Sequence, residues 1–130
     1  MRCLTNFARR RAARPPLSSV ARLNRSARRK SADILRCDQF DHEACGRPFT
    51  YWIDRSGYLD GRCWRAAENI AFGTGVLGTP RRIFTGWLQS AGHRRNLLGA
   101  YDDLGVGLRR GRLDRYGDAR VWTQHFAAHC

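Results

Sequence analysis

Apolar side chains follow a helical spacing between residues 80 and 89. They stand three and four positions apart, which predicts an amphipathic helix with one buried face. Thr79 and Pro80 mark its beginning, because a hydroxyl side chain can cap a helix and proline is well tolerated at the first helical position. The apolar face consists of Ile83, Phe84, Trp87 and Leu88.

Three further helices are predicted in the first half of the chain. The longest runs from a cap at Ser18 or Ser19 to about residue 36, and its buried side consists of Val20, Leu23, Ala27, Ile34 and Leu35. Residues 2–13 form an earlier helix, which a following pair of prolines cannot continue. Residues 48–55 form a short aromatic helix that ends at a glycine.

The remaining patterned segments indicate strands. Residues 65–72 make a strand that carries Glu68, while residues 103–110 and 119–127 alternate polar and apolar and pair as an antiparallel hairpin. Helices on both sides of a small, mainly antiparallel sheet give an α/β fold of the three-layer α/β/α sandwich type. We expect residues 1–130 to form one domain without a membrane span, since no apolar run approaches the roughly 20 residues required.

Positive charge is concentrated near the start of the chain. Residues 1–36 hold 11 basic side chains and one acidic side chain, whereas the other residues hold 13 and 10, for a net charge of +13. Such a block can bind the phosphates of nucleic acid or of anionic lipid. Because the segment lacks the regular aromatic interleaving that base stacking requires, we favour solvent-facing arginines on amphipathic helices and expect no nucleic-acid partner.

The chain contains five cysteines with no metal-binding spacing. Disulfides formed in an oxidising compartment are the favoured interpretation, with one cysteine left over. Fifteen arrangements are open, and among them we favour Cys37 with Cys45 and Cys63 with Cys130, which leaves Cys3 free. The alternative is five reduced, buried thiols.

Several short motifs occur in a recognisable order. They are Glu68-Asn69-Ile70-Ala71, Trp87, Ser90-Ala91-Gly92-His93-Arg94-Arg95-Asn96, Leu104-Gly105-Val106-Gly107 and Val121-Trp122-Thr123-Gln124. In this order and spacing the chain resembles the CAP superfamily, which takes in cysteine-rich secretory proteins, antigen 5 and pathogenesis-related 1 proteins, and above all its bacterial SCP-like branch. The resemblance extends to Phe40-Asp41-His42 and implies the same α/β/α layering.

The resemblance also implies a central cleft. In this superfamily two histidines and two glutamates line the cleft, and in some members they hold zinc or another divalent cation. By motif position three of these residues are His42, Glu68 and His93, whereas Ser90 stands where better-known members have the second glutamate. Three such ligands would leave one position open for water, as in a catalytic zinc site.

The same residues also have structural interpretations, because ligands 26 and 25 residues apart carry no metal signature of their own. Glu68 can be a buried acceptor that holds the turn around His93 or pairs with an arginine that follows it. His93 can be a capping or hydrogen-bonded core histidine. Ser90, Asn69 and Asn96 are expected to support the cleft, the asparagines by satisfying backbone groups.

Three classes of function follow from these observations. We favour a secreted, non-enzymatic CAP module, monomeric, that binds an extracellular protein, a lipid or another cell-envelope ligand at the cleft. A divalent-metal-dependent hydrolase using His42, Glu68 and His93 is the alternative, disfavoured because Ser90 removes a candidate general base. The third is a basic nucleic-acid or anionic-membrane binder through the arginine-rich helices.

Secretion itself is inferred from the cysteines and the resemblance. Residues 1–11 contain a cluster of arginines and no apolar stretch with a cleavage site, so they do not read as a signal peptide. Because the resemblance already begins within this segment, we expect an export signal to lie upstream of the printed sequence.

Overall fold

A computed structural model describes residues 1–61 and 63–130. Its elements in chain order are α1 (Arg2–Arg11), β1 (Ser18–Ser19), α2 (Ala21–Arg36), the 3-10 turn η1 (Ala44–Gly46), α3 (Tyr51–Asp54), β2 (Trp64–Gly73), the 3-10 turn η2 (Gly75–Gly78), α4 (Pro80–Gln89), α5 (Ala91–Leu97), β3 (Asp103–Leu113) and β4 (Tyr116–His129). The predicted helix over residues 80–89 is therefore confirmed as α4. None of the helices in the described ranges is long and apolar enough to cross a bilayer.

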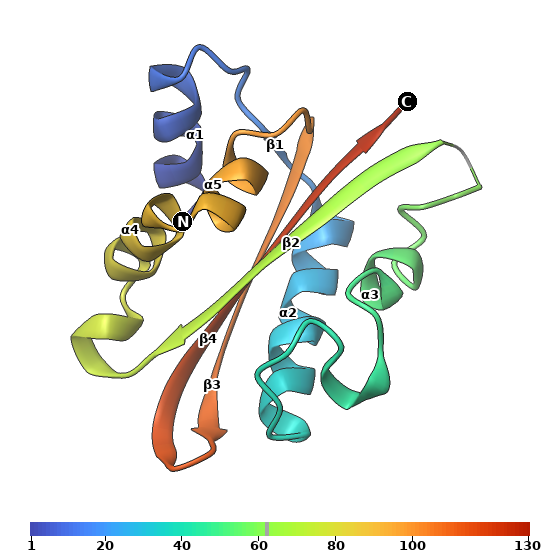
Figure 1. Cartoon of the computed structure of the whole chain (residues 1–130). Coiled ribbons are helices and arrows are strands. Elements are labelled where there is room, and N and C mark those ends of the chain that lie inside the picture. Colours follow the sequence, from blue (N-terminus) through green and yellow to red (C-terminus); the bar gives the residue numbers. More distant parts are fainter. Residues whose placement is uncertain (62) are drawn as a thin grey trace.

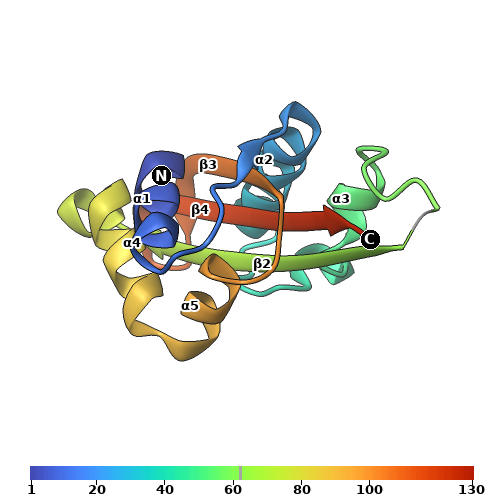
Figure 2. The same ribbon diagram turned by 90° about the horizontal axis from the view of Figure 1, so that it is seen from above.

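The sheet has four strands in the order β1-β3-β4-β2. β1 runs parallel to β3, while β3 with β4 and β4 with β2 are antiparallel. Figure 1 shows α1, α4 and α5 on one side of this sheet and α2 with α3 on the other, and Figure 2 shows the same layers from above. The predicted three-layer α/β/α sandwich with a mainly antiparallel sheet is confirmed.

The predicted cap of α2 at Ser18 or Ser19 is wrong. Ser18 and Ser19 form β1 opposite Asp103 and Leu104, and α2 begins after Val20 with no side-chain cap. The Ser18 amide donates to Asp102 O at 2.8 Å. Pairing with a segment distant in the sequence therefore holds these serines in a strand and not at the start of the helix. The predicted start of α4 is confirmed, with Thr79 at the N-cap position and Pro80 as the first helical residue, although the Thr79 hydroxyl donates to Val76 O and accepts no hydrogen bond from a helix amide.

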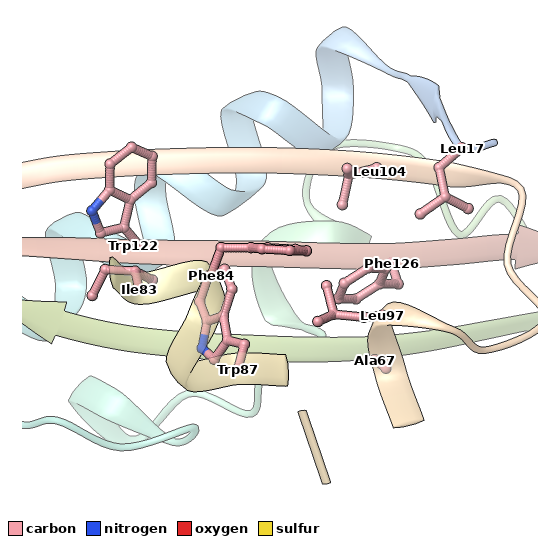
Figure 3. Close-up of a cluster of buried hydrophobic side chains, with 9 residues drawn as sticks. All are labelled: Leu17, Ala67, Ile83, Phe84, Trp87, Leu97, Leu104, Trp122 and Phe126. Atoms are coloured by element: carbon pink, nitrogen blue, oxygen red, sulfur yellow. The ribbon is translucent and has the colours of Figure 1, made fainter. Parts of the chain in front are cut away.

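The main core lies between α4, α5 and the sheet. Figure 3 shows its side chains: Leu17, Ala67, Ile83, Phe84, Trp87, Leu97, Leu104, Trp122 and Phe126. Trp87 and Trp122 are 2% and 7% exposed, so both are core residues. Each indole N–H donates to a backbone carbonyl, of Ile70 and of Gly78 respectively, so neither polar group is buried unpaired.

Both favoured disulfides are present. Cys37 is bonded to Cys45 across a short loop, and Cys63 is bonded to Cys130, which joins the beginning of β2 to the end of β4. Cys3 is exposed and is the free cysteine in the described part of the chain.

Candidate functional site

The candidate site lies along β2, the edge strand of the sheet. Two of its backbone carbonyls, those of Glu68 and Ile70, accept hydrogen bonds from Asn96 Nδ2 and Trp87 Nε1, each at 3.2 Å. Side chains of α4 and α5 thus occupy acceptors that another strand would otherwise use.

A cleft of about 550 Å³ follows the β2 edge. Its apolar walls are formed by Phe40, Ile70, Phe72, Leu77, Ile83 and Trp87. Polar side chains also line it: Arg82, Gln89, Ser90 and His93. Phe40 belongs to the loop after α2 and His93 to α5, so the cleft is built from both layers and could not be recognised from any one segment.

Glu68 lies beside this edge at the centre of a buried polar cluster. Its side chain is 1% exposed, and both carboxylate oxygens accept hydrogen bonds, Oε1 from His42 Nδ1 at 2.7 Å and Oε2 from His125 Nε2 at 2.8 Å. The ammonium of Lys30 lies 3.9 Å from Oε1 and donates to the backbone carbonyl of His42. The buried carboxylate therefore has a buried cation and two imidazoles around it, as a buried charge requires.

These contacts shift the pKa values of the cluster. Burial alone would raise the pKa of Glu68, but hydrogen bonds from His125 and His42, together with the charges of His125 and Lys30, lower it overall. The hydrogen bond with Glu68 raises the pKa of His42, while burial lowers the pKa of Lys30 against the attraction of Glu68. The cluster therefore favours an ionised carboxylate beside a readily protonated His42.

The polar cluster continues from β2 to β4 along the face of the sheet that α2 covers. His125 stands opposite Glu68 in the β2–β4 register, and its Nδ1 bonds to the hydroxyl of Ser26 on α2. Both His125 and Ser26 are almost completely buried. A continuous chain of polar contacts thus runs from His42, half-exposed at the edge, to a helix on the outer layer.

His93 lies on the other side of the β2 edge and makes different contacts. Its Nδ1 bonds to Ser90 Oγ at 2.9 Å, and its backbone carbonyl accepts from Asn69 Nδ2 at 3.2 Å. Burial and the nearby charge of His42 lower the pKa of His93. Asn96 also donates to Asn69 Oδ1, at 2.9 Å, so the two asparagines hold α5 against β2. The structure thus brings His42 and Glu68 into contact and places His93 close to them without a bond to the carboxylate.

Comparison with known proteins identifies the family. The profile described as CAP, the cysteine-rich secretory protein family, matches residues 4–126. This chain belongs to the CAP family. It is 33% identical over 126 residues to the uncharacterized protein YkwD of Bacillus subtilis (strain 168), across 95% of this chain and 44% of that protein.

Solved structures agree with this membership. An extracellular protein containing an SCP domain from Bacillus anthracis str. Ames matches with a TM-score of 0.75 at 28% identity, over 94% of this chain and 37% of that one. An outer surface protein from Borrelia burgdorferi shares the fold, with a TM-score of 0.76 at 17% identity, over 99% and 90% of the two chains. The present CAP chain thus spans less than half of both Bacillus relatives.

The residues around Glu68 do not offer a metal ion the ligand set that the family resemblance implies. In residues 1–61 and 63–130 no three His, Cys, Asp or Glu side chains converge as metal ligands. Both oxygens of Glu68 already accept imidazole hydrogen bonds. The ammonium of Lys30, 3.9 Å from Oε1, already compensates the carboxylate and would repel a metal ion. The zinc site with His42, Glu68 and His93 stays a prediction that this arrangement does not support.

Sequence reasoning misses three members of the Glu68 cluster: Lys30, His125 and Ser26. The alternating pattern marks His125 only as one position of a strand, and the basic segment includes Lys30 among its solvent-facing residues. Lys30 is instead 2% exposed. Knowledge of the β2–β4 register, which sets His125 opposite Glu68, would have identified this pair. A register depends on the partner strand and on which face is buried, and the sequence of one strand does not state either.

Arg9 is a further residue whose role the pattern did not reveal. It is 1% exposed, and its guanidinium donates to the carbonyls of Pro15, Leu97 and Gly99 at 2.7–2.9 Å. These acceptors lie beyond α1 and at the end of α5. Arg9 therefore fixes the end of α5, the helix that carries His93.

Proposed function

We propose that this CAP domain is an extracellular, non-enzymatic module that binds a small ligand with an apolar body in the β2-edge cleft. The observation that carries the proposal is the cleft itself, about 550 Å³ with walls that are mostly aromatic and aliphatic. Ligand pockets commonly have volumes of roughly 300–1,000 Å³ and combine an apolar lining with a few polar groups.

The lining indicates the chemistry of the ligand. Phe40 and Leu77 are 43% and 65% exposed, so a ligand that covered them would remove apolar surface from water. The polar side chains of the cleft, Arg82 and His93 among them, offer hydrogen bonds to a carboxylate or hydroxyl head group. A lipid with one short polar head fits this combination.

Binding is favoured over catalysis because the acid–base groups are engaged elsewhere. Ser90 and His93 are 2.9 Å apart, but none of the described carboxylates bonds to His93 to orient it as in a hydrolase triad. Glu68 is buried and each of its oxygens already accepts an imidazole hydrogen bond, so it is poorly placed to take a proton from a substrate.

An extracellular location is supported by two observations. The chain carries two disulfides, which persist mainly in oxidising compartments. The similar Bacillus anthracis protein is described as extracellular. Both agree with a protein that meets its ligand outside the cytoplasm.

A substitution at Gly86 tests the proposal. Gly86 lines the cleft on α4, and no atom lies within 4 Å of the place where its Cβ would stand, so Gly86→Leu adds a side chain at the cleft wall without a backbone clash. Leucine also favours the helix over glycine. We expect the wild-type protein to bind the neutral fluorophore Nile red saturably, dodecanoate to displace it, and Gly86→Leu to weaken binding by more than about tenfold.

Gly92→Leu is the matched control. Gly92 on α5 also has open space around its Cβ position and does not line the cleft, so its affinity for Nile red should equal that of the wild type. Equal binding by Gly86→Leu and the wild type, or no saturable binding by the wild type, would refute the assignment of the cleft.

A further inference from the structure

A second pocket lies on the opposite layer, between α2 and α3. Its lining consists of Arg25, Ser26, Arg29, Trp52, Arg55 and Ser56, and its volume is about 130 Å³. We call it the α2–α3 pocket. Figure 1 shows α3 packed beside α2, away from α4 and α5, so this pocket is separate from the β2-edge cleft.

Three of the lining side chains are guanidiniums without a counterion. Arg25, Arg29 and Arg55 are exposed, and in the described part of the chain none of them forms an ion pair. The neighbouring Arg36 and Arg47, by contrast, bind Asp33 at 3.0 and 2.8 Å. Asp33 is thereby already neutralised, and the positive charge of the pocket remains available to an anion from solution.

Trp52 gives this pocket a fixed wall. Its indole N–H donates to Asp33 Oδ2 at 2.7 Å, and the guanidiniums of Arg29 and Arg47 stand 4.9 and 5.1 Å from its ring centroid. Because arginines lie over the ring, Trp52 is poorly placed to stack with a nucleobase. The aromatic side chain orients these arginines, and their N–H groups remain as hydrogen-bond donors to a ligand.

The two serines of the pocket contribute little hydrogen-bonding capacity of their own. The Ser26 hydroxyl bonds to His125, and Ser56 Oγ donates to Ile53 O at 2.6 Å. The pocket is small, about 130 Å³ against about 550 Å³ for the β2-edge cleft, which suits one compact oxyanion better than a larger ligand.

We propose that the α2–α3 pocket is a phosphate-group binding site, with Arg25, Arg29 and Arg55 as the donors. Guanidinium forks match the oxygen spacing of phosphate and form charge-assisted pairs of hydrogen bonds with it. The phosphate can belong to a lipid head group or to a free phosphate or soluble phosphoester, since the pocket recognises the group that these share.

A titration with inorganic phosphate at constant ionic strength tests the site. The Trp52 indole N–H resonance is the local probe, because this side chain forms the pocket wall. We expect saturable shifts with phosphate and none with chloride. The double substitution Arg25→Gln with Arg55→Gln should weaken phosphate binding by more than about tenfold, since it removes two of the three guanidiniums that form charge-assisted hydrogen bonds with the anion.

The control removes the same charge elsewhere. Arg11 and Arg81 are exposed and line neither pocket, so Arg11→Gln with Arg81→Gln should bind phosphate as the wild type does. Equal weakening in both double variants, or equal shifts with chloride, would mean that only net charge matters and would overturn the site.

Vesicles distinguish the two sources of phosphate. Co-flotation with phosphatidic acid vesicles but not with phosphatidylcholine vesicles, lost in the Arg25/Arg55 double variant, supports a lipid head group. Phosphate binding without co-flotation supports a soluble phosphate or phosphoester. Absence of both phosphate binding and co-flotation in the wild type would overturn the proposal.

Discussion

At the scale of single residues, Glu68 shows how a buried charge is accommodated in this protein. Its carboxylate accepts from two imidazoles, and Lys30 supplies the compensating charge at 3.9 Å. A buried charge that loses one partner is costly, because the partner left behind stays out of water and unpaired. The cluster is therefore sensitive to the removal of either charge.

Replacing the carboxylate by an amide should expose this dependence. Glu68→Gln keeps the shape but leaves the buried ammonium of Lys30 uncompensated, so we expect the free energy of unfolding to fall by about 3–5 kcal/mol in urea denaturation at pH 7. Lys30→Met in the same background should recover part of the loss, since removing both charges is milder than removing one. A loss below about 1 kcal/mol for Glu68→Gln would contradict the compensated-charge interpretation.

At the scale of elements, the loop between α2 and α3 positions His42 against the edge strand. The Cys37–Cys45 disulfide closes this loop, and Cys45 itself has a left-handed backbone with φ of 63°. Such a conformation is unfavourable for a residue other than glycine and persists when neighbouring contacts hold it. The disulfide and the bond from Lys30 to the His42 carbonyl together place the imidazole beside Glu68.

Opening this loop should change both stability and titration. The double substitution Cys37→Ser with Cys45→Ser should cost about 2.5 kcal/mol by the chain-entropy relation, measured by urea denaturation. The pKa of His42, followed by NMR, should move back toward its ordinary value of 6.5, because the hydrogen bond with Glu68 is formed for less of the time when the loop is open. An unchanged titration would mean that the contact from Lys30 alone holds His42.

The pH dependence of stability follows from the same shift. A histidine whose pKa is higher in the folded than in the unfolded state stabilises the fold. This contribution is fully present below the pKa of the unfolded state, 6.5, and is lost as the pH rises through the pKa of the folded state. The destabilisation caused by opening the loop should therefore be largest below pH 6.5 and should shrink above the raised pKa of His42. Unfolding curves collected across this interval measure the difference.

At the scale of the whole molecule, two glycines set the distance between the layers. A Cβ atom on Gly105 would come within 2.2 Å of the Leu23 backbone, and one on Gly107 within 2.2 Å of the Ala27 backbone. The backbone of α2 thus rests directly on β3. This close approach explains why glycines alternate in the segment Leu104-Gly105-Val106-Gly107 that also carries the family resemblance.

A single methyl group should disturb this packing. Gly107→Ala must push α2 away from the sheet, and we expect a loss of about 3 kcal/mol or more in the free energy of unfolding, near the upper end for overpacked cores. Gly117→Ala on β4 is the control, because no atom lies within 4 Å of its Cβ position, and its effect should stay within about 0.5 kcal/mol. Equal effects of the two alanines would contradict the role of Gly107 as a spacer.

Local patterns in the sequence determined most of the secondary structure and the layering. The spacing of apolar residues in α4 states which face of this helix is buried, and helices with one buried face on a sheet give a layered sandwich. β4, an inner strand, is buried on both faces from Val121 to Ala128, so alternation does not describe its burial. The motif order likewise drew attention to His42, Glu68 and His93, of which the first two are bonded to each other and only His93 lines the β2-edge cleft. These features depend on residues close together in the chain or on motifs read in order, and so they can be predicted without coordinates.

Only the tertiary structure decided which groups pair. His125 is 57 residues from Glu68 and meets it through the strand register, and Lys30 reaches the same carboxylate because α2 docks on the sheet. Trp52 lies under Arg29 for a similar reason, although no aromatic pattern accompanies the arginines in the sequence. Charge and hydrogen-bond partners depend on distances of a few ångströms between remote segments, and periodicity fixes the faces of elements but not those distances.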